Sequence, residues 1–188
     1  MSDSWRPQRI VVLGCGNPSR GDDALGPLLM ARLEDWVQAH PGSAVEAFQD
    51  FQLQVEHTLD LEGRDLVLFV DAAVSGPDPY AFRRVTPAAD LRGDSHALSP
   101  AGLLHAFRAL GCGEPPPAYV LAVRGHAFHL GTELSAQAQR NAEAAWQRLA
   151  WLLEHPSPAY WDGLALERLS ASGPLQSLIS ASRSPSSH

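Results

Sequence analysis

Short apolar runs alternate with longer amphipathic segments along most of the chain. Unbroken apolar runs occupy residues 10–13, 66–70 and 119–123, and weaker candidates occupy 44–48 and 81–85. Such runs are typical of strands that are buried on both faces of a sheet. In the last candidate, Phe82 and Arg84 face the opposite way from Arg83 and Val85, which predicts an edge strand.

Helical spacing fills the intervals between these runs. Leu25, Leu29 and Leu33 begin one apolar stripe, and Pro27 restricts the start of this helix because proline is tolerated only in the first turn. Asp22 and Asp23 must therefore lie at or just before the helix N-terminus. Further helices are predicted from Ser99 (an N-cap followed by proline) to residue 110, and over residues 135–153.

Alternation of strands and helices predicts an α/β fold. We expect a three-layer sandwich in which a twisted, mostly parallel sheet of about five strands is flanked by helices. We place a single domain at residues 1–156. Residues 157–188 lose the periodic pattern and become rich in serine and proline, so we expect a loosely ordered tail.

Composition narrows the class of protein. The formal charge is −7, which argues against a general nucleic-acid-binding protein. All 14 basic residues are arginine, so chemistry that needs a lysine amine is excluded. Two cysteines are too few for a disulfide framework, and no signal peptide or membrane-spanning run is visible, so we expect a cytoplasmic protein without membrane insertion.

Three polar residues follow predicted strands or precede a predicted helix at what should be one edge of the sheet. Asp23 follows the first strand, Asp71 ends a central strand, and His96 lies in the loop before the Ser99 helix cap. Ligands of open α/β sheets bind beyond the carboxyl ends of the strands. Two carboxylates and one imidazole gathered there would suit a divalent metal with open coordination positions.

Each of these residues also has a purely structural interpretation. Asp22 or Asp23 could cap the following helix and interact with its dipole. Asp71 could form a turn at the end of its strand, and His96 could be a solvent-exposed loop residue. Their shared placement at one edge favours the functional interpretation.

Other motifs are weaker candidates. Gly14 and Gly16 follow a strand, as in dinucleotide-binding proteins, but Ser19 stands where the third glycine would be needed. His126 and His129 have a spacing that can hold a metal, although they could simply lie in a surface loop. Cys15 could act as a nucleophile near His96, but a small buried cysteine in a glycine-rich turn is more common.

Four spaced motifs together resemble the hydrogenase maturation endopeptidases. The motifs are Gly14-Cys15-Gly16-Asn17 with Asp22-Asp23-Ala24-Leu25-Gly26, then Phe69-Val70-Asp71-Ala72, then His96 with Leu98-Ser99, and finally Gly131-Thr132-Glu133-Leu134-Ser135. The resemblance covers roughly residues 9–153.

The resemblance implies a hydrolase that removes a C-terminal extension from the large subunit of a nickel-iron hydrogenase after nickel insertion. It implies that Asp23, Asp71 and His96 are both the metal-binding and the catalytic residues of a metal-dependent, aspartyl-type endopeptidase. The implied metal is nickel that the substrate supplies, and other divalent metals are expected to substitute for it. The implied partner is the immature large subunit.

Two features depart from the family pattern. Many members carry glutamate at the position of Asp23, and the Arg124-Gly125-His126 stretch and the long tail are also unexpected. Two alternative functions therefore stay open: a non-catalytic, metal-dependent assembly factor, and a nucleotide-binding α/β protein.

Overall fold

A five-stranded sheet forms the centre of the described part of the chain. The computed structural model describes residues 7–90 and 97–171, with side chains up to residue 166. The strands are β1 (Ile10–Cys15), β2 (Val45–Asp50), β3 (Leu66–Ala73), β4 (Tyr80–Val85) and β5 (Ala118–Arg124). Their order is β2-β1-β3-β5-β4, and only β4 runs antiparallel to its neighbour. This confirms the predicted mostly parallel sheet, with the alternating strand at an edge.

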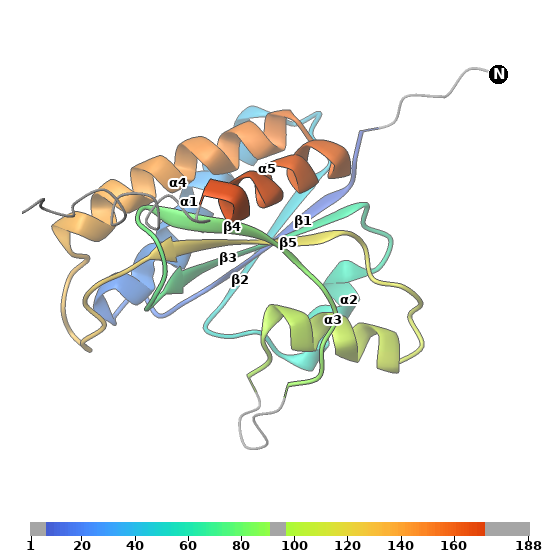
Figure 1. Ribbon diagram of the computed structural model, residues 1–188, viewed down its shortest axis with the longest axis horizontal. Coiled ribbons are helices and arrows are strands. Elements are labelled where there is room, and N and C mark those ends of the chain that lie inside the picture. The colour runs from blue at the N-terminus through green and yellow to red at the C-terminus, as the bar shows by residue number, and fades with distance from the viewer. Residues whose placement is uncertain (1–6, 91–96, 172–188) are drawn as a thin grey trace, which may run out of the picture.

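Helices cover both faces of this sheet (Figure 1). They are α1 (Leu25–Ala39), α2 (Thr58–Leu61), α3 (Pro100–Ala109), α4 (Ala136–Glu154) and α5 (Pro158–Ala171), with 3-10 turns η1 (Gly21–Ala24) and η2 (Val55–His57). α1, α4 and α5 lie on one face, and α2 and α3 lie on the other. The predicted three-layer sandwich is therefore confirmed.

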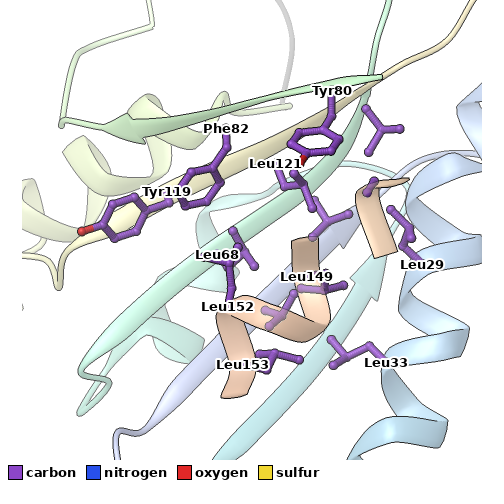
Figure 2. Packing of buried hydrophobic residues seen from close by; sticks show 14 of the residues in the cluster. Leu29, Leu33, Leu68, Tyr80, Phe82, Tyr119, Leu121, Leu149, Leu152 and Leu153 are labelled. Carbon is purple, nitrogen blue, oxygen red and sulfur yellow. The ribbon is translucent and has the colours of Figure 1, made fainter. Parts of the chain in front are cut away.

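Each face of the sheet carries its own hydrophobic core, because alternate residues of a strand point to opposite faces. The larger core joins the strands to α1 and α4, and Figure 2 shows leucines from both helices meeting Leu68 and Leu121. The smaller core contains Val11, Leu13 and Cys15 together with α3. Residues Cys15 and Asp71 consequently belong to the face that α2 and α3 cover.

The helix starts follow the predicted capping chemistry. The Ser99 hydroxyl accepts a hydrogen bond from the Gly102 N–H at 3.0 Å, with Pro100 at the first helical position. Ser135 caps α4 in the same way, accepting from the Ala138 N–H at 3.1 Å. Pro27 lies in the first turn of α1 as expected.

α5 is a helix that the sequence pattern did not predict. Trp161 is fully buried and packs edge-on against Tyr119 and Phe82, with ring centroids 5.2 and 6.3 Å away. Tyr119 donates its hydroxyl proton to Asp162 at 2.9 Å. The structure thus differs from the expected loose tail over residues 158–166, while residues 172–188 lie outside the described part.

Candidate active site

Three parallel strands place polar side chains side by side near the same edge of the sheet. β3 does not end at Asp71, as the sequence predicted, but continues to Ala73, because its last residues still pair with β5. Cys15 of β1 pairs in register with Asp50 of β2, and Gly14 pairs with Val70 of β3, so that Cys15 is level with Asp71. We call Asp50, Cys15 and Asp71 the strand-end row. All three belong to the face covered by α2 and α3, because side chains alternate along each strand.

The loop after β1 brings Asp23 back to this row. A Cβ atom at Gly26 would lie 1.8 Å from the Cys15 carbonyl oxygen, and one at Gly16 would lie 2.1 Å from the Asp23 carbonyl oxygen. Only glycine allows these backbones to approach so closely, and Gly16 also has a positive φ of 143°. The Asp23 carboxylate is half-buried and accepts a hydrogen bond from the Asn17 N–H at 2.9 Å.

Asp23 lies near enough to Asp71 for its charge to act on that carboxylate. Burial raises the pKa of Asp71 to about 6, the Ala72 N–H lowers it by hydrogen bonding, and the charge of Asp23 raises it further. Burial also raises the pKa of the Cys15 thiol to about 12, with added contributions from Asp71, Asp50 and Asp23. The fold therefore brings together two of the three predicted site residues.

Cys15 is a buried thiol rather than a nucleophile. With a pKa of about 12 it stays protonated at neutral pH, and the reactive form of a cysteine is the thiolate. This agrees with the interpretation of Cys15 as a small buried residue in a glycine turn.

Asp22 has a structural role that separates it from Asp23. Its buried carboxylate accepts hydrogen bonds from the N–H groups of His126, Ala127 and Ser135, at 2.7, 2.9 and 2.7 Å, and from the Ser135 hydroxyl at 2.8 Å. Burial alone would raise the pKa of Asp22, but these four bonds together lower it. Asp22 makes no capping bond to its own helix and instead holds the loop between β5 and α4.

His96 lies outside the described residues, so its predicted place in the site stays a prediction. The chain is described again from Ala97 onward. Leu98 donates a backbone hydrogen bond to Leu53 at 2.8 Å, and Leu53 follows Asp50 by only three residues. The segment that follows His96 is thus fixed to the segment that follows the strand-end row.

The weaker candidates do not join this row. His126 is exposed and contacts Asp78 at 2.9 Å, and His129 is also exposed. Over residues 7–90 and 97–166, no group of three or more His, Cys, Asp or Glu side chains is arranged to hold a metal ion. Gly14 packs against Met30, whose Cγ would lie 2.1 Å from an added Cβ, so packing accounts for this glycine without a nucleotide.

Asp50 is a site residue that the sequence analysis missed. Its carboxylate lies 3.6 Å from the His57 Nε2 and raises the pKa of Cys15. The sequence pattern that pointed to Asp71 also applied to Asp50, because both residues follow a predicted strand. The predicted strand ended at residue 48, which left Asp50 in a loop.

None of the helices in the described part of the chain is both long and apolar enough to span a membrane. No protein-family model matches the chain, and no curated protein matches it.

Solved structures nevertheless show a shared fold. The chain is 25% identical to the NiFe hydrogenase maturation protease HycI from Thermococcus kodakarensis KOD1, over 78% of this chain and 93% of that one, with a TM-score of 0.59. It is 24% identical to the hydrogenase maturating endopeptidase HybD from E. coli, with the same shares and a TM-score of 0.60. An endopeptidase from Escherichia coli gives 24% identity, shares of 78% and 93%, and a TM-score of 0.58. These structures confirm the resemblance predicted from the four motifs.

Proposed function

We propose that the chain is an endopeptidase that removes the C-terminal extension from the large subunit of a nickel-iron hydrogenase after nickel insertion. The observation that carries this proposal is the coupled pair Asp23 and Asp71 at the carboxyl edge of the sheet. The shared fold with hydrogenase maturation proteases supports the same reaction class.

The donor set suits the nickel of an immature large subunit. Within the described residues, Asp23 accepts one hydrogen bond, from the Asn17 N–H, and Asp71 accepts one, from the Ala72 N–H. No arginine of the same residues pairs with either carboxylate. Each carboxylate therefore keeps oxygen lone pairs free for a ligand. Together with His96, these side chains would complete the coordination of nickel seated in the substrate, and that nickel would supply polarisation of the scissile carbonyl.

Asp71 is suited to the proton transfers of hydrolysis. In the metal-free protein, burial and the charge of Asp23 raise the pKa of Asp71 to about 6, above that of an ordinary aspartate. A carboxylate oxygen that does not bind the nickel would accept a proton from water and later release it. In the proposed reaction, water oxygen bonds to the carbonyl carbon while its proton passes to Asp71. The peptide C–N bond then breaks, and that proton goes to the leaving nitrogen.

Incubation of the purified protein with large-subunit precursor, followed by intact mass measurement, tests the function. We expect the nickel-loaded precursor to lose its extension and the nickel-free precursor to stay intact. Asp71→Asn and His96→Ala should fold normally and reduce cleavage by about a thousand-fold or more, because general acid–base catalysis alone contributes 10²–10⁴-fold. The exposed Asp35→Asn is the matched control.

The same experiment separates the proposal from its main alternative. Binding of nickel-loaded precursor without any loss of mass would indicate an assembly factor in place of a peptidase. Normal cleavage by His96→Ala would remove that histidine from the mechanism.

A further inference from the structure

β2 is an edge strand with free backbone groups on its outer side. Ile10 donates its N–H to Ala44, and Gly16 donates to Asp50, so the even-numbered residues of β2 face β1. Since backbone direction alternates along a strand, Ala47 and Gln49 face outward. Within the described residues, no backbone hydrogen bond engages the outward groups of these two residues. Such an edge is a template for an added strand.

This edge leads directly to the candidate active site. β2 ends at Asp50, the first member of the strand-end row. Neighbouring strands lie about 4.8 Å apart, so Cys15 and Asp71 follow at about 5 and 10 Å from β2 across the ends of β1 and β3. An extended chain that runs along β2 and turns across the strand ends would therefore pass over the carboxylates.

Exposed apolar side chains accompany the same segment. Phe51 and Leu59 are each 68% exposed, and Phe48 and Val55 are exposed as well. The segment folds back toward the strand end, because His57 contacts Asp50 at 3.6 Å. Single exposed apolar residues are ordinary, but four within residues 48–59 beside an open edge mark an interaction surface.

Charge distinguishes between the possible occupants of this surface. Asp23, Asp50 and Asp71 all lie near enough to Cys15 for their charges to raise its pKa. Over the described residues, His57 is the only basic side chain that contacts one of them. A second copy of this chain carries the same excess of acidic residues, a net −7, so charge disfavours pairing between copies. The partner that best matches this surface is an extended peptide segment with apolar side chains and with a positively charged group at the point where it passes Asp50.

We infer that the outer edge of β2 binds the C-terminal region of the large-subunit precursor as an added strand, which delivers the scissile peptide to Asp23 and Asp71. This inference rests on the proposed function and names how the substrate is held. Main-chain hydrogen bonds to Ala47 and Gln49 would supply affinity, and the exposed Phe48 and Phe51 would contact its side chains.

A pair of substitutions at Gln49 tests the backbone contact. Gln49→Pro removes the outward N–H but no hydrogen bond to β1, since proline is tolerated where a strand N–H faces solvent. We expect its cleavage rate at low precursor concentration to be about ten-fold or more below that of Gln49→Ala, which keeps the N–H, and we expect the difference to lie in KM. Equal rates for the two variants would overturn the inference.

A second measurement does not depend on either variant or on turnover. Amide hydrogen exchange at Ala47 and Gln49 should slow when nickel-loaded precursor is added, and lack of protection on a bound precursor would overturn the inference. If the unaltered protein cuts nothing, the proposed function fails, yet exchange still reports whether β2 holds the precursor. Protection of these amides without precursor, in a dimer seen by size-exclusion chromatography, would assign the edge to a second copy and overturn the inference.

Discussion

Asp22 and Asp71 lie near the same edge of the sheet, but their surroundings act on them in opposite directions. Four hydrogen bonds saturate the Asp22 carboxylate and lower its pKa. Asp71 receives one backbone hydrogen bond, and burial together with the charge of Asp23 raises its pKa to about 6. A saturated carboxylate holds the fold together, whereas a half-buried carboxylate with free lone pairs lowers stability and is available to a ligand or a proton.

Removing the saturated carboxylate should have the largest effect on stability. Asp22→Ala leaves three backbone N–H groups without their acceptor. Buried donors without partners cost ~1–3 kcal/mol each, so we expect a loss of about 4 kcal/mol in the free energy of unfolding at pH 7. Urea denaturation measures this loss, with Asp35→Ala as the exposed control.

The pH dependence of that loss has a defined sign. The folded-state pKa of Asp22 is depressed, so its stabilisation is present above the unfolded pKa and disappears as pH falls through the folded value. The gap between Asp22→Ala and the unaltered protein should therefore narrow in acid. A constant gap down to about pH 2 would contradict the role given to the ionised carboxylate.

Asp71→Asn should act in the opposite direction. The folded pKa of about 6 exceeds the ordinary value of 3.8, so ionisation of Asp71 lowers stability as pH rises through this window and the cost stays constant above it. One pKa unit corresponds to ~1.4 kcal/mol, so the variant should be more stable at pH 8 by up to about 3 kcal/mol. Near pH 3 the two proteins should be equal.

Urea titrations in metal-free buffer at several pH values would measure this difference, with Asp35→Asn as control. An asparagine carbonyl can still accept the Ala72 N–H, so the comparison isolates the charge. A gain in stability that did not change with pH would point to packing instead of ionisation.

The smallest effect concerns the thiol between the carboxylates. With its pKa at about 12, Cys15 should resist iodoacetamide at pH 8 in the folded protein, while the exposed Cys112 should react. Peptide mass mapping before and after addition of urea distinguishes the two sites. Rapid labelling of Cys15 in the folded state would mean that solvent reaches the thiol and that burial and the nearby carboxylates do not raise its pKa.

Local sequence rules were sufficient for Asp23 and Asp71, which lie near the carboxyl ends of β1 and β3 although neither is the last residue of a strand. Asp71 and Asp23 were predicted as neighbours because parallel strands end at one edge, and the structure brings them together. The role of Asp22 could not be predicted, since its donors lie more than 100 positions away, at His126, Ala127 and Ser135. The contact between Asp22 and these donors depends on how the chain after β5 passes the end of β1, and no local sequence pattern predicts that arrangement.

The last helix was missed for a related reason. α5 has no clear apolar stripe, and its attachment depends on Trp161 filling the space beside Tyr119 and Phe82. A single large aromatic residue makes this contact. Hydrophobic periodicity detects apolar residues that recur at a regular spacing, so it does not detect a helix that is attached by one residue. His96, the third predicted site residue, remains a prediction.

Trp161 also has a consequence for synthesis of the protein on the ribosome. The indole that closes the aromatic cluster over β4 and β5 is encoded after nearly all of the rest of the core. Until that codon has been translated and the segment has left the ribosome, the nascent chain presents one side of Phe82 and Tyr119 uncovered. Products of premature termination before this point would expose an apolar surface of the kind that leads to aggregation.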